Sequence, residues 1–211
     1  MLAKVDALIK SVENMEENRE LFFRRINMMY PTLDPRYQRI ERIYNLVKDA
    51  FRDDFRDGGV RYFEHLRAVT LIMIDYLGIT DPDDICAGLG HDLHEDKRKQ
   101  WPIERMKYEF GHESTLIIQY VSKPPKEEYP IKEDREAVFF DVFRNAPRRA
   151  VILKLADVLH NMRTIWECED KKRLAKIHQY ENHYRYYARR EIILMHELDG
   201  AWRQLLVGCP T

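Results

Sequence analysis

The sequence VILKLADVL, residues 151–159, is apolar on almost every side when it is wound into a helix. A helix without a polar face is predicted to lie in the interior of a protein. Asp157 stands in the middle of this run, where an uncompensated carboxylate would be costly. We therefore expect Asp157 to be paired with a cation, hydrogen-bonded, or bound to a metal ion.

A second acidic group follows another run of small and apolar residues. The sequence ICAGLG, residues 85–90, leads directly into His91 and Asp92, and its helix is predicted to continue through both. Neighbouring residues differ by about 100° around a helix axis, so His91 and Asp92 can approach one ion at adjacent positions. Glu95 and Asp96 then lie one turn further on, near a water molecule held by that ion.

Two other segments carry residues that complete a metal site. Asn161 and Thr164 follow Asp157 at i+4 and i+7, which gives one ligand followed by two neutral hydrogen-bonding groups. His65 lies on the flank of an apolar helical stripe and would supply a second imidazole. Two imidazoles and two carboxylates suit Mn²⁺, Fe²⁺ or Zn²⁺. Because such a cation generates hydroxide near neutral pH and shields phosphate charge, the pattern indicates phosphoester hydrolysis.

Each of these residues has a plainer interpretation when it is taken alone. His65 alone would be a histidine at the edge of the core, and Asp157 alone would pair with Lys or Arg. The dipeptide His91-Asp92 alone would belong to a solvated acidic helix end. It is the occurrence of all four together that favours a metal site.

Composition narrows the class of protein. The chain has 35 basic and 36 acidic residues, a formal charge of −1, and 45% hydrophobic residues. These values exclude a disordered protein and give no overall electrostatic bias towards nucleic acid or an anionic membrane.

Residues 1–15 carry four charged side chains and form no signal peptide, and no apolar stretch approaches the roughly 18–20 residues that span a bilayer. Three widely spaced cysteines indicate neither a disulfide framework nor a thiolate zinc site. We expect a cytoplasmic protein without nucleic-acid or membrane partners.

Helical periodicity, without any segment of strand period, predicts an all-α globule. Residues 1–45 are predicted to form N-terminal amphipathic helices. Residues 46–211 are predicted to form a second unit, a helical domain that ends in C-terminal helices. Within it, residues 52–59 form a polar loop, and the last helix is predicted to run from about Lys171 far towards the C-terminus.

The ordered set of His65, His91, Asp92 and Asp157 resembles the HD superfamily of metal-dependent phosphohydrolases. The sequence that follows the second histidine is more specific. HDLHED, residues 91–96, matches the HDxxED signature of the hydrolase domain of Rel/SpoT-type alarmone enzymes.

Three further strings extend this resemblance. KLADVLHNMRT, residues 154–164, is similar to that family's KLADRLHNMRT at ten of eleven positions. FGHE, residues 110–113, resembles the family's FG-x-E element, and RDGGVRYFEH, residues 56–65, its R-x-x-G-x-x-Y-x-x-H stretch. The similarity covers roughly residues 47–190, and no synthetase domain follows it. The chain thus resembles a small alarmone hydrolase that stands alone.

The resemblance implies an HD-domain helical globule with one Mn²⁺, or another divalent cation, in each chain. The implied metal ligands are His65, His91, Asp92 and Asp157. The implied catalytic pair, which orients or activates the attacking water, is Glu95 and Asp96. The implied activity is removal of the 3′-pyrophosphate from ppGpp or pppGpp, which leaves GDP or GTP.

The resemblance also implies contacts with the nucleotide. Arg56 would stack on the guanine base, a role suited to a planar guanidinium. Asn161 and Thr164 would contact the sugar and the phosphates. The implied partner is therefore a small-molecule nucleotide, and the interpretation is compatible with a homo-oligomer.

Two departures from the family leave alternatives open. Val158 replaces the usual Arg of KLADRLHN, and Lys97 follows the acidic pair where the family commonly has Thr. One alternative is an HD phosphohydrolase of another nucleotide, such as a dNTP, a nucleoside monophosphate or NADPH. The other is a non-catalytic protein that binds alarmone and docks through the helix expected over residues 2–29. The intact pair of Glu95 and Asp96 argues against the latter, since a binding protein needs no group that activates water.

Overall fold

The structure is a computed structural model, and it describes residues 15–208. Among these residues there is no strand, only an isolated bridge between Phe55 and Arg61, so the predicted all-α class is confirmed. Of the helix expected over residues 2–29, the part before Met15 lies outside the described residues, and the part from Met15 onward is helical. The elements are α2 (Met15–Met29), α3 (Pro35–Ala50), α4 (Tyr62–Leu71), η1 (Ile72–Tyr76), α5 (Pro82–Gly90), α6 (Leu93–Asp96), α7 (Ile103–Phe110), α8 (His112–Val121), α9 (Lys132–Phe143), α10 (Arg148–Thr164), η2 (Ile165–Glu167), α11 (Asp170–Gln179), η3 (Tyr180–Tyr184), α12 (Arg185–Glu191) and α13 (Met195–Gly208).

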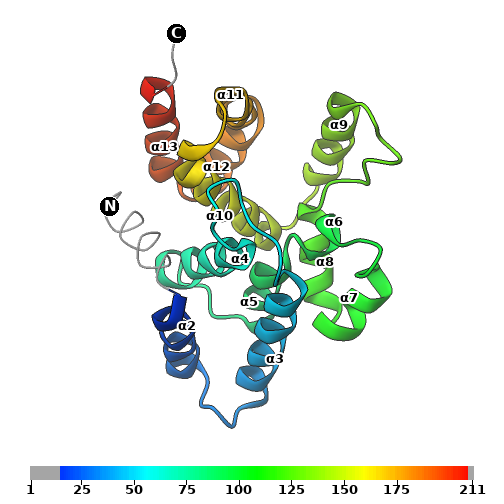
Figure 1. Cartoon of the computed structure of the whole chain (residues 1–211), viewed down its shortest axis with the longest axis vertical. Helices are drawn as coiled ribbons and strands as arrows, with labels where there is room; N and C mark the ends of the chain where they lie inside the picture. Colours follow the sequence, from blue (N-terminus) through cyan, green and yellow to red (C-terminus); the bar gives the residue numbers. More distant parts are fainter. Residues whose placement is uncertain (1–14, 209–211) are drawn as a thin grey trace.

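Helix α10 runs through the middle of the molecule, as its apolar sequence predicts (Figure 1). It packs against α4, α5 and α8 on one side and against α13 on the other. Val151, Leu155 and Leu159 are completely buried. Asp157 is therefore carried into the interior by a helix whose position is fixed by apolar packing.

Helix α5 has strong local signals at its start and close packing at its end. The Asp81 carboxylate accepts a hydrogen bond from the backbone N–H of Asp83 (2.8 Å), and Pro82 occupies the first turn. At the other end, a side chain on Gly90 would collide with the ring of Phe110. The glycine thus allows α5 to approach the end of α7 closely.

The helix does not continue through His91 and Asp92, so that prediction is wrong. Helix α5 ends at Gly90, the two residues form a turn, and α6 begins at Leu93. The backbone N–H of Asp96 still donates to the carbonyl of Asp92 (2.8 Å), so the acidic pair remains about one turn beyond the dipeptide.

The single long C-terminal helix was also predicted wrongly. The chain forms α11, a π-helical turn η3, and α12, and it then breaks before α13. Ile192 and Leu194 have φ angles of 56° and 50°, in the left-handed region that reverses a helical path. The break lets α13 pack on both α10 and α12.

The N-terminal helices share the core of the rest of the chain. The rings of Phe22 in α2 and Tyr44 in α3 lie 5.1 Å apart and are buried. Helix α3 packs on α5 and spans the boundary predicted between residues 45 and 46. The division into two units remains a prediction. None of the helices in the described range is long and apolar enough to cross a bilayer.

Candidate metal centre and nucleotide cavity

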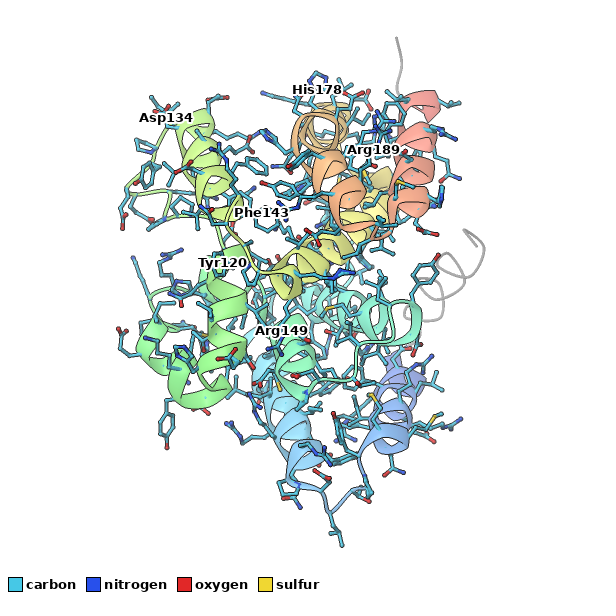
Figure 2. All side chains as sticks on the ribbon, turned by 180° about the vertical axis from the view of Figure 1, so that it is seen from behind. Tyr120, Asp134, Phe143, Arg149, His178 and Arg189 are labelled. Carbon is cyan, nitrogen blue, oxygen red and sulfur yellow. The ribbon has the colours of Figure 1, made fainter. Side chains whose placement is uncertain are left out.

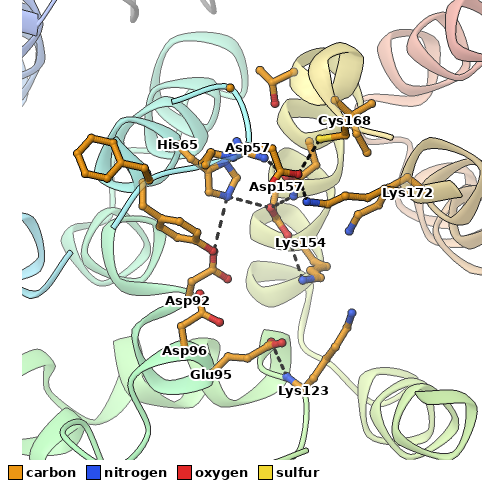
Figure 3. Close-up of a pocket in the computed structure, with 18 residues that line it drawn as sticks. Asp57, His65, Asp92, Glu95, Asp96, Lys123, Lys154, Asp157, Cys168 and Lys172 are labelled. Atoms are coloured by element: carbon orange, nitrogen blue, oxygen red, sulfur yellow. Dashed lines mark hydrogen bonds and ion pairs between the residues drawn. The ribbon is translucent and has the colours of Figure 1, made fainter. Parts of the chain in front are cut away.

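Three separate segments bring two histidines and two aspartates together. His65 comes from α4, His91 and Asp92 from the turn after α5, and Asp157 from the middle of α10. The Nε2 atom of His65 lies 3.3 Å from Asp157 Oδ1 and 3.6 Å from Asp92 Oδ2. The Nε2 atom of His91 lies 3.4 Å from Asp92 Oδ2 and 3.8 Å from Asp157 Oδ1. Figure 3 shows three of these side chains converging on one point.

This donor set fits a divalent cation. Ligand atoms of His65, His91 and Asp157 all lie within 4.8 Å of one another, and the three side chains are buried. Among the described residues, the Nε2 atom of His91 has no hydrogen-bond partner although it is buried. Such an orphaned nitrogen is costly unless it meets a ligand. Nitrogen and oxygen donors in equal number suit Mn²⁺, Fe²⁺ or Zn²⁺.

The same carboxylates also have cationic neighbours in the protein. Lys154 Nζ lies 3.0 Å from Asp157 Oδ2, so the pairing considered for Asp157 alone occurs alongside the histidine cluster. Although burial opposes it, the charges of Lys154 and the histidines hold the pKa of Asp157 well below its usual range. Burial likewise opposes charge on His91, but Asp92 and Asp157 raise its pKa to about 9. The carboxylate of Asp157 is therefore ionised at neutral pH, as a metal ligand must be.

Hydrogen bonds behind the imidazoles orient them. His91 Nδ1 lies 2.8 Å from the carbonyl oxygen of Gly88, to which it donates, so its Nε2 atom faces the cluster. His65 Nδ1 lies 2.9 Å from Nδ1 of His160, and an Arg56 nitrogen lies 3.2 Å from that same atom. Burial, followed by the nearby His65 and Arg56, lowers the pKa of His160 well below its usual range. His160 is therefore neutral, and because His65 meets it through Nδ1, the Nε2 atom of His65 faces the cluster.

The acidic pair lies at the edge of the same cluster. Burial and the charge of Asp92 raise the pKa of Asp96 to about 6. Tyr62 donates to Asp92 Oδ2 (2.8 Å). Because burial and the charge of Asp92 raise the pKa of Tyr62, its hydroxyl stays neutral. Glu95 accepts from the backbone N–H of Lys123 (2.8 Å) and from Arg135 (3.1 Å). The two carboxylates thus have different environments. Asp96 holds a proton more readily than an ordinary aspartate, and Glu95 is fixed by two hydrogen-bond donors.

A cavity of about 290 Å³ opens beside the cluster. Its lining includes every other residue expected at the site: Glu95, Asp96, Arg56, Asn161 and Thr164. His91 is the one expected ligand that does not line it. Arg56 donates to Asn161 Oδ1 (2.6 Å), Asn161 donates to Asp157 Oδ1 (2.5 Å), and Thr164 donates to the carbonyl of His160 (2.9 Å).

Four lysines line the cavity, Lys172 among them, and three of the four had no expected role: Lys123, Lys154 and Lys176. Lys123 lies in the loop that follows α8, Lys154 in α10 and Lys176 in α11. Burial lowers the pKa of Lys123, and burial together with Lys123 lowers the pKa of Lys176 to about 8. A lysine on the otherwise apolar helix of residues 151–159 is a signal that could have been read from the sequence. The other two are joined to it only by tertiary packing.

Comparison with known proteins gives the same architecture. A family model described as HD domain matches residues 44–191. A GTP pyrophosphokinase of Streptomyces coelicolor is 36% identical over 129 residues, which are 61% of this chain and 15% of that protein. The bifunctional (p)ppGpp synthase/hydrolase SpoT of Escherichia coli is 30% identical over 156 residues, which cover 72% of this chain and 22% of that protein. The chain thus spans about a fifth or less of the length of these two relatives.

A solved structure shares the fold. It is described as a metazoan ortholog of SpoT that hydrolyzes ppGpp and plays a role in starvation responses. The TM-score is 0.68 at 21% sequence identity, over 79% of this chain and 94% of that one. At this identity the similarity concerns the fold.

Proposed function

The chain belongs to the HD-domain family, and on this premise we propose that it hydrolyses ppGpp or pppGpp to pyrophosphate and GDP or GTP. The reaction requires a divalent cation, for which we propose Mn²⁺, held by His65, His91, Asp92 and Asp157. The enzyme would act on this nucleotide in the cytoplasm.

The observation that carries the proposal is a metal-type cluster beside a cavity that four lysines line: Lys123, Lys154, Lys172 and Lys176. A substrate with two diphosphate groups brings several negative charges, which Lys123, Lys154 and Lys176 can offset. The nitrogen and oxygen ligands beside them suit a cation that acts on a phosphoester. A cavity of about 290 Å³ accommodates the reacting part of a nucleotide, with the remainder at its open side.

The acidic pair supplies the proton chemistry in this proposal. When bound, the cation supplies a Lewis acid that favours hydroxide over water and offsets phosphate charge. Asp96, with its pKa of about 6, can exchange a proton near neutral pH. Glu95, held by Lys123 N–H and Arg135, orients the attacking water or the leaving 3′ oxygen.

Arg56 and Asn161 are proposed to bind the nucleoside. Arg56 is held by His160 and Asn161, which fixes the plane of its guanidinium at the cavity wall. A fixed guanidinium loses little entropy when a purine stacks on it. Thr164, one turn further along α10, lies beside the same part of the cavity and would contact the sugar.

A substrate panel tests the proposal directly. Purified protein with Mn²⁺ is expected to release pyrophosphate and GDP from ppGpp, and to leave dGTP, dATP, AMP and NADPH largely unchanged. Asp157→Asn protein, purified in the same way, controls for contaminating activity and should be inactive. Product analysis by anion-exchange chromatography identifies the bond that is cut.

The alternatives make different predictions in this assay. Turnover of dNTPs, monophosphates or NADPH with ppGpp left intact would replace the alarmone by another nucleotide. Binding of ppGpp without turnover, so that the amount of intact nucleotide is the same with and without EDTA, would indicate a non-catalytic binding protein.

A further inference from the structure

The cavity has two ends with different chemistry. In Figure 3, Lys123 and Glu95 lie at one side of the pocket, and Asp57 and Cys168 lie at the other. The first end carries Lys123, which suits phosphates, whereas at the second end Lys172 is paired with Asp57. The second end is formed by the loop of residues 55–58 and by the segment after α10, and it includes the exposed ring of Phe55.

Asp57 is the acidic residue of this second end. It directly follows Arg56, the residue proposed to stack on the base, and both side chains line the cavity. An ionised carboxylate accepts hydrogen bonds and donates none, so a nucleotide group that binds it must offer hydrogen-bond donors. The Watson–Crick edge of guanine offers two adjacent donors, N1–H and the 2-amino group. Adenine has an acceptor at N1 and no 2-amino group.

The contacts of Asp57 leave one of its two oxygens, Oδ1, able to accept such donors. Lys172 Nζ and Cys168 Sγ both donate to Oδ2, at 2.5 Å and 3.0 Å. Within the part of the chain that the structure describes, no hydrogen bond is recorded at Oδ1. The side chain is about half exposed, so a ligand can reach it. Lys172 also lowers the pKa of Asp57, which keeps the carboxylate ionised at neutral pH.

We propose that the Asp57 carboxylate recognises the N1–H and 2-amino donors of guanine and thereby makes the site prefer guanine over adenine nucleotides. The inference rests on the proposed function, because it places the base of the same substrate next to Arg56. It assigns Asp57 a role in specificity, separate from the metal ligands and the acidic pair.

The test compares base preference in two variants of the same loop. Asp57→Asn keeps the shape of the side chain but removes one acceptor, and Asp57→Ala removes both. Asp53→Asn is the matched control, since Asp53 is exposed in the same loop and does not line the cavity. Each protein is assayed with Mn²⁺ on ppGpp, on its inosine analogue, which lacks the 2-amino group, and on its adenosine analogue. Dissociation constants for GDP and ADP are measured by calorimetry.

We expect Asp57→Asn to lower kcat/KM for ppGpp by about tenfold or more, chiefly through KM, and to weaken GDP binding similarly. The adenosine analogue and ADP should be nearly unaffected, and the wild-type rate on the inosine analogue should fall between the other two. The control Asp53→Asn should keep the wild-type preference. An equal loss on guanine and adenine compounds, or an unchanged ratio in both Asp57 variants, would overturn the assignment.

The activity assays and the binding measurements together separate this inference from the proposed function. If ppGpp is cleaved but its preference over the adenosine analogue does not depend on Asp57, only the role of Asp57 is wrong. If ppGpp is not cleaved while Asp57→Asn still selectively weakens GDP binding, the proposed reaction is wrong and the base contact stands.

Discussion

Single side chains determine how the cavity binds negative charge, and Lys176 is a cavity lysine whose own charge changes within about one pH unit of neutrality. Burial and the positive charge of Lys123 lower its pKa from the usual 10.5 to about 8, against the opposing charges of Asp157 and Asp92. Lys176 is therefore charged below pH 8 and becomes neutral above it. Because a neutral amine binds phosphate weakly, we expect KM for ppGpp to rise as the pH passes through about 8.

Replacing this lysine should remove the pH step. A hydrogen bond to a charged group contributes about 1.5–3 kcal/mol, so Lys176→Met should raise KM at pH 7 roughly tenfold or more. The substituted enzyme should then show a flat KM between pH 7 and 9, measured by initial rates in one buffer system. Lys171→Met, at an exposed position of the same helix, should retain the step. A step that persists in Lys176→Met would assign the titration to another group.

Glu95 and Asp96 are expected to serve the chemical step rather than cation affinity. Glu95→Gln or Asp96→Asn should lower kcat by about 10²–10⁴, the usual scale for general acid–base catalysis. Mn²⁺ binding, followed by calorimetry in the absence of substrate, should be retained, because Asp92 and Asp157, and neither of these two carboxylates among the described residues, lie within 4.0 Å of the imidazoles. Loss of Mn²⁺ binding in either variant would make that residue a ligand.

At the scale of secondary structure, α9 holds the carboxylate of Glu95, for which we propose a catalytic role. Its C-terminal half is anchored by Phe143, which packs against Tyr187, while its beginning, near Asp134, projects away from the body (Figure 2). From the first turns of this helix Arg135 reaches Glu95 at 3.1 Å and the carbonyl of Pro124 at 2.6 Å. Helix α9 thus braces both Glu95 and the loop before it.

We therefore expect Arg135→Gln to misplace Glu95 and to lower kcat by about ten- to a hundredfold, with little change in KM. Arg135→Lys should restore part of the rate, which a purely structural role would not require. Arg144→Gln is the control, since Arg144 makes only an exposed ion pair with Asp141 on the same helix. Stopped-flow rates and thermal melting of all three variants distinguish the outcomes: a fall in melting temperature that accounts for the lost activity would contradict a positioning role.

The elements were predictable where local signals are strong. The apolar run of residues 151–159 predicted a buried helix, and the capping sequence at Asp81 and Pro82 predicted the start of α5. The breaks were missed because helical spacing continues across them. Ile192 and Leu194 adopt left-handed conformations although β-branched and bulky residues disfavour them, so tertiary packing of α13 outweighs the local preference.

Across the whole molecule, the sequence identified the residues that cluster but not everything that surrounds them. The four expected metal ligands come together from α4, the turn after α5, and α10. No role could be assigned to Lys123 and Lys176 from the sequence, because nothing in their local sequence shows that the loop after α8 and helix α11 line the same cavity. Their placement depends on how the helices pack, which one sequence does not specify.

Because the four ligands belong to three separate segments, a bound cation would cross-link the fold. A ligand that binds only the folded state stabilises it by RT ln(1 + [L]/Kd), about 2.7 kcal/mol at a hundredfold excess over Kd. For a chain of this size, that corresponds to a rise of roughly 5–10 °C in Tm. We expect Mn²⁺ to produce such a rise, measured by differential scanning calorimetry, and EDTA to reverse it.

The same measurement tests the individual ligands. Asp92→Asn and Asp157→Asn each remove a charged oxygen from the cluster, so each should abolish the increment caused by Mn²⁺, whatever the Tm of the metal-free variant. Asp141→Asn, an equal change at an exposed position of α9, should keep the full increment. The increment is the informative quantity, because Asp157 also pairs with Lys154 and its loss will shift the stability of the metal-free protein as well. If both aspartate variants respond to Mn²⁺ as the wild type does, the cation binds elsewhere and the proposed ligand set is wrong.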